Sequence, residues 1–177
     1  VGRTYTTYAD VQRDTLLLLL SASRRDRLRA YTWTYPIVGA VHGAFDLPQR
    51  KQTQRILRAL HSCYFTVLAH PAGRLLGERE AMDVDWLRIV RAARERGCFL
   101  ELNAQPDRLD LDDVHCRMAR EEGVLVAVNS DAHSTFDFAH LAFGIGQARR
   151  GWLEAKDVLN TRSLKELKPL LAKTMGR

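Results

Sequence analysis

Residues 98–128, CFLELNAQPDRLDLDDVHCRMAREEGVLVAV, contain the smallest complete repeat of the predicted fold. The apolar run 98–102 predicts a buried strand, and the amphipathic stretch after Pro106 predicts a helix over about 111–122. Gly123 is a typical helix stop, and the β-branched run 124–128 predicts a second strand. A strand, a helix and a strand in this order are typical of parallel strands joined by a crossover helix.

The same alternation continues on both sides of this repeat. Apolar runs at 37–41 and 65–69 predict two further strands. A helix is expected after Asp46-Leu47-Pro48, because proline suits a first turn, and the last helix should begin at Ser163, which forms a capping-box pattern with Glu166. Another helix is expected over about 84–96, with these residues inward: Trp86, Leu87, Ile89, Val90 and Ala93. The chain is therefore predicted to be α/β, and both a barrel and an open parallel sheet fit this pattern.

The first 36 residues do not join this alternation. A helix over about 8–21 and a strand over 31–35 are expected there, and this segment contains no histidine. The sequence therefore predicts two parts, residues 1–36 and residues 37–177.

The composition is that of a soluble globular protein, with 46% hydrophobic and 27% charged residues. The formal net charge of +6 favours a polyanionic partner such as nucleic acid only weakly, because many soluble proteins have basic surfaces. The cysteines Cys63, Cys98 and Cys116 lie in or beside apolar stretches, which predicts buried thiols and neither a disulfide framework nor a zinc knuckle. We expect a cytoplasmic protein with no signal peptide and no membrane span.

Residues of the types that bind metal ions follow the predicted strands. His42 follows the first strand, His70 the second, and Asp131 and His133 the fourth. The carboxyl ends of parallel strands meet at one edge, so these side chains should lie together, with Asp131 and His133 pointing the same way from an extended segment. Zinc, manganese and iron prefer imidazole and carboxylate ligands. We predict that these four residues are both the metal ligands and the catalytic residues.

Other polar residues near the strand ends have different expected roles. Glu101, at the end of the third strand, is expected to hold a backbone N–H or an arginine rather than a metal ion. Arginine pairs bidentately with phosphate, which makes three loop residues candidates for substrate binding: Arg74, Arg79 and Arg108. Three histidines on helical stretches are expected at the surface or in satisfied core contacts: His61, His115 and His140.

Several segments resemble the PHP (polymerase and histidinol phosphatase) domain, in the version at the C-terminus of bacterial and archaeal family X DNA polymerases. They are VHGAFDL at 41–47, AHPAGRLLG at 69–77, ELNAQPDRLD at 101–110, NSDAHS at 129–134 and GIGQARRGWL at 144–153. The resemblance covers about residues 37–171. It implies that residues 37–177 are the C-terminal part of a distorted (β/α)7 barrel with parallel strands and crossover helices.

The same resemblance implies a chemistry and a partner. It implies one to three Mn²⁺ or Zn²⁺ ions, phosphoester hydrolysis, and a 3′–5′ exonuclease that contacts DNA through its phosphate backbone or 3′ end. Ligand positions of the family match His42, His70, Asp131 and His133, whereas Glu101 matches a recurrent residue that is not a ligand. A bound metal ion would polarise a phosphoryl oxygen and lower the pKa of bound water.

The resemblance leaves three functions open. A PHP domain carries a His-x-His pair and further ligands before the position of His42, and residues 1–41 contain no histidine. The first function is a metal-dependent phosphoesterase, and the second is a catalytically incomplete scaffold that binds DNA or a protein partner. The third is a small-molecule phosphatase of the histidinol-phosphate type. An incomplete barrel would also expose strand edges, which predicts self-association.

Overall fold

The computed structural model describes residues 37–41, 43–61 and 65–174. His42, Cys63, the predicted helix over 8–21 and the predicted strand over 31–35 lie outside these residues. Within the described residues, the predicted alternation of strands and helices is present.

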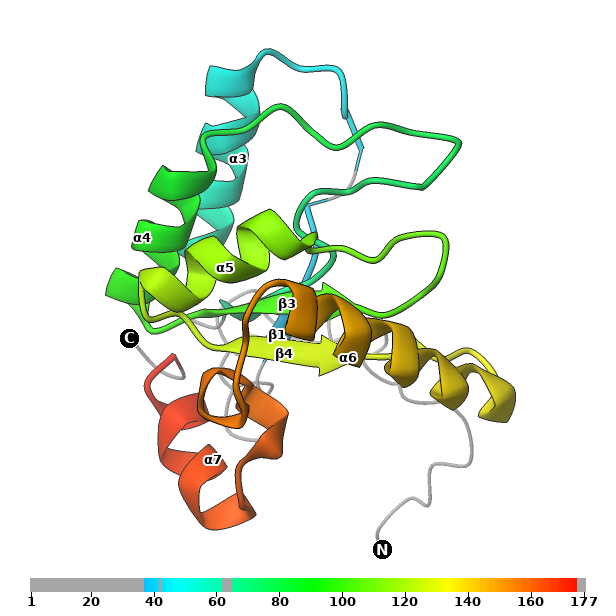
Figure 1. Cartoon of the computed structure of the whole chain (residues 1–177). Coiled ribbons are helices and arrows are strands. Elements are labelled where there is room, and N and C mark those ends of the chain that lie inside the picture. Colours follow the sequence, from blue (N-terminus) through cyan, green and yellow to red (C-terminus); the bar gives the residue numbers. More distant parts are fainter. Residues whose placement is uncertain (1–36, 42, 62–64, 175–177) are drawn as a thin grey trace, which may run out of the picture. The chain divides into compact units, whose positions relative to one another are not determined.

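Four parallel strands form one sheet (Figure 1). They are β1 (Ile37–Gly39), β2 (Phe65–Leu68), β3 (Phe99–Asn103) and β4 (Val126–Asn129). Each strand lies beside the next one along the chain, and every pair is parallel. The predicted α/β fold with parallel strands and crossover helices is therefore confirmed, while closure into a (β/α)7 barrel goes beyond these four strands and remains a proposal.

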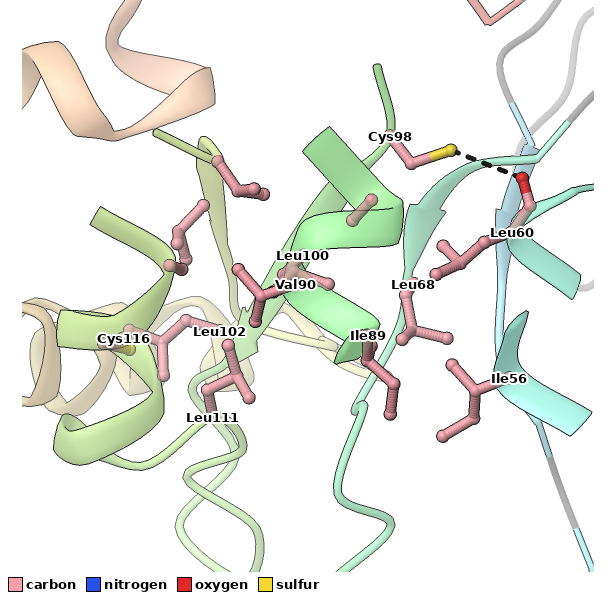
Figure 2. Close-up of a cluster of buried hydrophobic side chains, with 14 of the residues drawn as sticks. Ile56, Leu60, Leu68, Ile89, Val90, Cys98, Leu100, Leu102, Leu111 and Cys116 are labelled. Carbon is pink, nitrogen blue, oxygen red and sulfur yellow. Dashed lines mark hydrogen bonds between the residues drawn. The ribbon is translucent and has the colours of Figure 1, made fainter. Parts of the chain in front are cut away.

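One face of the sheet is covered by helices. These are α3 (Gln49–Leu60), α4 (Trp86–Arg96), α5 (Asp113–Glu121) and α6 (Leu141–Arg150). The main core joins them to the paired residues Leu68, Leu100 and Val126, and Figure 2 shows Ile56, Leu68 and Ile89 among its side chains.

In the part of the chain that the structure describes, none of the helices has the length and apolar character needed to span a membrane.

The other face of the sheet has a smaller core. The alternate strand residues Val67, Phe99 and Ala127 pack with Leu159 and with leucines of α7 (Leu164–Ala172), which lies on the opposite side of the sheet from α3, α4 and α5 (Figure 1). The helix α7 begins after Ser163, where Ser163 and Glu166 form the predicted capping box. Because both faces are covered, the strands are almost continuously apolar in sequence.

The free edge of β4 is covered by the chain that precedes α7. Val126 bridges Val158 in parallel, and the side chain of Asn160 bonds both backbone groups of Val128. The N–H of Val128 donates to Oδ1 of Asn160 at 3.1 Å, and Nδ2 of Asn160 donates to the Val128 carbonyl at 2.7 Å. These backbone groups of β4 are therefore not available to a strand of a second chain. Self-association through an exposed strand edge stays a prediction, and it would have to use an edge other than this one.

Two features of the helical layer differ from the sequence prediction. Leu87 is 40% exposed, so its inward placement is wrong; it lies about 200° around the helix from the fully buried Ile89. In this region the sequence predicted only that His140 lies on a helical stretch, with no bounds for a helix. The structure has the 3₁₀ helix η1 (Thr135–His140) followed by α6. The glycines of α6 weaken its sequence signal, but Gly144 lets the helix approach the sheet, since a Cβ there would lie 2.7 Å from the Cβ of Ala104.

The cysteines Cys98 and Cys116 are buried, as predicted. The Cys98 thiol donates to the Phe65 carbonyl at 3.2 Å and is directed at the Leu60 carbonyl at 3.8 Å (Figure 2). Burial raises the pKa of the Cys116 thiol to about 12, which keeps it neutral. Both side chains therefore act as small apolar groups.

Candidate active site at the strand ends

The candidate site lies at the carboxyl ends of β2, β3 and β4. His70 follows the last residue of β2 by two positions, and Asp131 follows the last residue of β4 by two. Glu101 and Asn103 occupy the end of β3, where Asn103 pairs with Asn129 of β4. Because the strands are parallel, these residues meet at one edge of the sheet.

The carboxylate of Glu101 joins the three strand ends. Its Oε2 accepts the backbone N–H of His70 at 2.7 Å and the amide of Asn103 at 3.4 Å, while Oε1 accepts the amide of Asn129 at 2.8 Å. The residue is only 5% exposed. Burial raises the pKa of Glu101, and the three hydrogen bonds oppose that rise. The prediction that Glu101 holds a backbone N–H is confirmed.

The carboxylate of Asp131 is held from β3 and the loop after it. Nδ2 of Asn103 donates to Oδ2 of Asp131 at 3.0 Å, so one amide group connects Glu101 to Asp131. Nε of Arg108 lies 3.9 Å from the same oxygen, and the side chain of Gln105 donates to the Asp131 carbonyl at 2.9 Å. The position of Asp131 therefore depends on contacts with residues 23 or more positions away in sequence.

The backbone turns at two of the candidate ligands. The φ angle is 30° at His70 and 51° at Asp131, in the left-handed region that side chains other than glycine adopt at a cost. The expected extended segment between Asp131 and His133 is therefore wrong. Nδ1 of the exposed His133 ring instead lies 2.7 Å from the Asp131 carbonyl. Strained backbone of this kind clusters at functional sites in proteins.

The helix η1 is anchored directly to His133. Oδ2 of Asp137 accepts the backbone N–H groups of His133 and Ser134, each at 2.8 Å, and Oδ1 accepts the Ser134 hydroxyl at 2.9 Å. The bond from the His133 N–H, followed by that from the Ser134 hydroxyl, holds the pKa of Asp137 below its usual range. The start of η1 is thus fixed to the edge of the candidate site.

Asp110 ties the loop after β2 to the loop after β3. Its carboxylate accepts the N–H of Ala72 at 3.0 Å and that of Gly73 at 2.8 Å, and the side chain is fully buried. Its backbone N–H donates to the Asn103 carbonyl at 3.1 Å. Burial raises the pKa of Asp110 to about 6, against the opposing effect of these N–H groups and of Arg74. Sequence reasoning assigned this residue no role.

Arg74 and Arg108 occupy neighbouring loops. Nε of Arg74 donates to the Arg108 carbonyl at 2.8 Å, a second guanidinium nitrogen bonds the Leu109 carbonyl, and a third lies 3.9 Å from Asp112. Arg74 therefore supports the loop that carries Arg108. The predicted contact of either residue with a substrate remains a proposal, and Arg108 is the better placed because it lies beside Asp131.

Arg79 contacts the same group of loops. Its Nε donates to the Gly73 carbonyl at 2.8 Å, and its guanidinium carbon lies 3.8 Å from the centroid of the Phe45 ring. This cation–π contact uses one face of the guanidinium. Binding of a substrate by Arg79 would therefore compete with contacts that hold the loop, and that role remains a proposal.

The three histidines on helical stretches lie in different settings. His61 is exposed, with Nδ1 2.7 Å from the Leu57 carbonyl. Nδ1 of His115 lies 2.7 Å from Oδ1 of Asp112, and the His115 ring packs at a tilt of 38° against Trp86, with 4.3 Å between the ring centroids. These two match the prediction. His140 does not, because its buried Nδ1 has no hydrogen-bond partner among the described residues.

The donor types at this edge suit a transition-metal ion, but their positions do not form a complete site. Within residues 37–41, 43–61 and 65–174, no group of three histidine, cysteine, aspartate or glutamate side chains could hold a metal ion. His42 lies outside these ranges. A metal site here would need His42 or another donor beyond the described residues, so the metal and catalytic roles of His42, His70, Asp131 and His133 remain proposals.

The fold and the strand-end site define an α/β protein with a polar cluster at the carboxyl edge of a parallel sheet. The chain is 38% identical over 135 residues to the DNA polymerase/3′-5′ exonuclease PolX of Bacillus subtilis (strain 168). It is 26% identical over 134 residues to a probable phosphatase of Thermoanaerobacter sp. (strain X514), and 29% identical over 93 residues to a probable phosphatase of Caldanaerobacter subterraneus subsp. tengcongensis. The first likeness confirms the predicted resemblance to family X DNA polymerases.

Each of these likenesses covers a larger share of this chain than of the relative. The alignments take in 76%, 71% and 49% of this chain, but only 24% of the polymerase and 52% and 34% of the two phosphatases. The activities, substrates and partners of the whole relatives therefore enter only as proposals for this chain.

A family model described as "Putative aminopeptidase" matches residues 1–61. The match covers about a third of the chain, and it includes the segment 1–36 that does not resemble the PHP domain. Among the described residues it reaches β1 and α3 and ends before His70. It therefore does not involve the strand-end cluster formed by β2, β3 and β4.

Proposed function

We propose that this chain is a metal-dependent phosphoesterase module that hydrolyses DNA in the manner of a 3′–5′ exonuclease, in the context of a family X DNA polymerase. The observation that carries the proposal is the 38% identity to the polymerase/exonuclease over 135 residues. A continuous stretch of that length in a chain of 177 residues must include residues 43–135. The similarity therefore extends across His70, Glu101, Asp131 and His133.

In this proposal the metal ligands are His42, His70, Asp131 and His133, and the ion is Mn²⁺ or Zn²⁺. Such an ion, when bound, supplies charge stabilisation for a phosphoryl group and a more acidic bound water. Glu101 holds the His70 backbone directly and Asp131 through Asn103. Arg108 places a guanidinium beside Asp131, where a phosphate of DNA would enter.

Two other functions have specific observations in their favour. A catalytically incomplete scaffold that binds DNA or a protein is favoured by the lack of a three-donor group among the described residues. A phosphatase for small molecules, such as the histidinol-phosphate type, is favoured by the two relatives named as probable phosphatases. Each of these makes a different prediction for the same assay.

The test is hydrolysis by the purified full chain with Mn²⁺, with and without a chelator. The substrates are a 5′-labelled single-stranded oligonucleotide and p-nitrophenyl phosphate. We expect stepwise shortening of the oligonucleotide that stops with the chelator and falls at least about 100-fold in Asp131→Asn, because the amide replaces a charged donor. The exposed Asp107→Asn is the matched control and should keep full activity.

Three results would reject the proposal. Hydrolysis of the monoester without shortening of DNA would favour the phosphatase, and absence of both activities would favour the incomplete scaffold. Activity that survives both the chelator and Asp131→Asn would show that the hydrolysis does not come from this site.

A further inference from the structure

The helix η1 presents aromatic rings to solvent immediately after the candidate site. Phe136 is 86% exposed and Phe138 is 60% exposed. Scattered exposed apolar residues are normal on protein surfaces, but a phenylalanine with so little contact gains almost nothing for folding. The high exposure of Phe136 is therefore better explained by a contact with another molecule.

Phe136 is held close to His133. The two residues are three positions apart, with the extended Ser134 between them and the start of η1, so their Cα atoms lie no more than about 11 Å apart. Asp137 fixes this turn, because its carboxylate accepts the N–H groups of both His133 and Ser134. The exposed ring of Phe136 is therefore carried by a segment whose start is anchored to the His133 backbone.

The surroundings of Phe136 favour a nucleobase as the molecule that covers the ring. The carboxylate of Asp137, next to Phe136, already accepts hydrogen bonds from three donors. The guanidinium of Arg108, a group that pairs well with phosphate, lies beside Asp131 at the same strand ends. A phosphate placed at that edge would leave the attached base free to reach an exposed ring. Aromatic side chains stack on every base, which suits a substrate that is shortened without regard to sequence.

We propose that Phe136 is a substrate-binding residue that stacks on a base near the end of single-stranded DNA while the phosphate lies at the Asp131 and His133 edge. This inference rests on the proposed function and adds the means by which the site distinguishes a nucleic acid from a small phosphate monoester.

The experiment measures binding of the full chain to two oligonucleotides of equal length, oligothymidylate and a fully abasic analogue, with Ca²⁺ present in place of Mn²⁺. Both have the same phosphates, and only the first has bases. We expect the parent to bind oligothymidylate roughly 5- to 150-fold more tightly than the analogue, as one base–aromatic stack provides. Phe136→Ala should remove this preference and leave binding of the abasic analogue unchanged.

Three further variants separate stacking from other effects of the ring. Phe136→Trp should keep the preference, and Phe136→Leu, which stays apolar without a flat face, should lose it. Phe143→Ala removes another exposed ring, on α6, and should have no effect. Equal binding of the two oligonucleotides by the parent would overturn the proposal, and so would retention of the preference in Phe136→Ala.

The outcomes also separate this inference from the proposed function. Hydrolysis of DNA without a preference for bases would overturn the stacking role and leave the phosphoesterase intact. A base preference without hydrolysis would support stacking and reject the enzyme. Loss of self-association in Phe136→Ala, measured by sedimentation, with no change in base preference would assign the ring to a contact between copies and overturn the proposal.

Discussion

Replacing Glu101 by glutamine should lower the free energy of unfolding by about 2–4 kcal/mol. Three donors converge on this buried carboxylate, from His70, Asn103 and Asn129. Glutamine has one acceptor oxygen, so its amide nitrogen would have to face a donor, and at least one buried N–H would lose its partner. Chemical denaturation of the parent and the variant measures the difference.

In the proposed metal site, the same substitution should also weaken binding of Mn²⁺ or Zn²⁺ by about 10- to 100-fold, the usual effect of losing a group that orients ligands. Glu101 fixes the His70 backbone and, through Asn103, the Asp131 carboxylate. Glu95→Gln, on the exposed side of α4, is the matched control and should change neither quantity. A variant Glu101→Gln with the stability and metal affinity of the parent would contradict the role assigned to this residue.

Replacing Asp110 by alanine should destabilise the protein by about 2–4 kcal/mol, because the buried N–H groups of Ala72 and Gly73 would lose their acceptor. The two loops that carry His70 and Arg108 are joined by this carboxylate, so they should also become more mobile. Asp107→Ala, at an exposed position of the same loop, should cost less than about 0.5 kcal/mol. Denaturation curves of the three proteins provide the comparison.

The cost of Asp110→Ala should depend on pH in a defined direction. The pKa of Asp110 is raised from 3.8 to about 6 in the folded protein, so the folded state binds this proton more tightly than the unfolded state. The stabilisation from this proton is complete below about pH 4 and is lost as the pH rises through 6. Between pH 7.5 and pH 5 the parent should therefore gain about 1 kcal/mol that the variant lacks. A larger cost at pH 7.5 than at pH 5 would contradict this.

The parts of the fold that follow local patterns could be predicted from the sequence. The strand β2 and the start of β3 are mainly apolar, as expected of strands covered on both faces, and α7 begins at a capping box formed by residues three positions apart. The role of Glu101 followed from the same reasoning, because a carboxylate inside an apolar run needs hydrogen-bond donors. In each case the deciding interaction is local or is required by burial alone.

The parts that depend on distant contacts could not be predicted. Asp110 is buried only because the loop at residues 72–73 supplies its donors, and Asn160 gains its role from Val128, 32 positions earlier. The backbone carbonyl of Asp131 accepts a hydrogen bond from the side chain of Gln105, which is 26 positions away. A sequence pattern that considers neighbours along the chain contains no signal for such contacts.

The central claim, that a metal ion binds at the strand ends, is tested most directly by metal stoichiometry. The full chain is equilibrated with Mn²⁺ or Zn²⁺ and dialysed, and its metal content is compared with that of Asp131→Ala combined with His133→Ala. The exposed pair His61→Ala and Asp107→Ala is the matched control, with the same two residue types removed. The account predicts at least one ion per chain in the parent and the control, and none in the first double variant. A parent chain without metal, or an equal metal content in all three proteins, would contradict it.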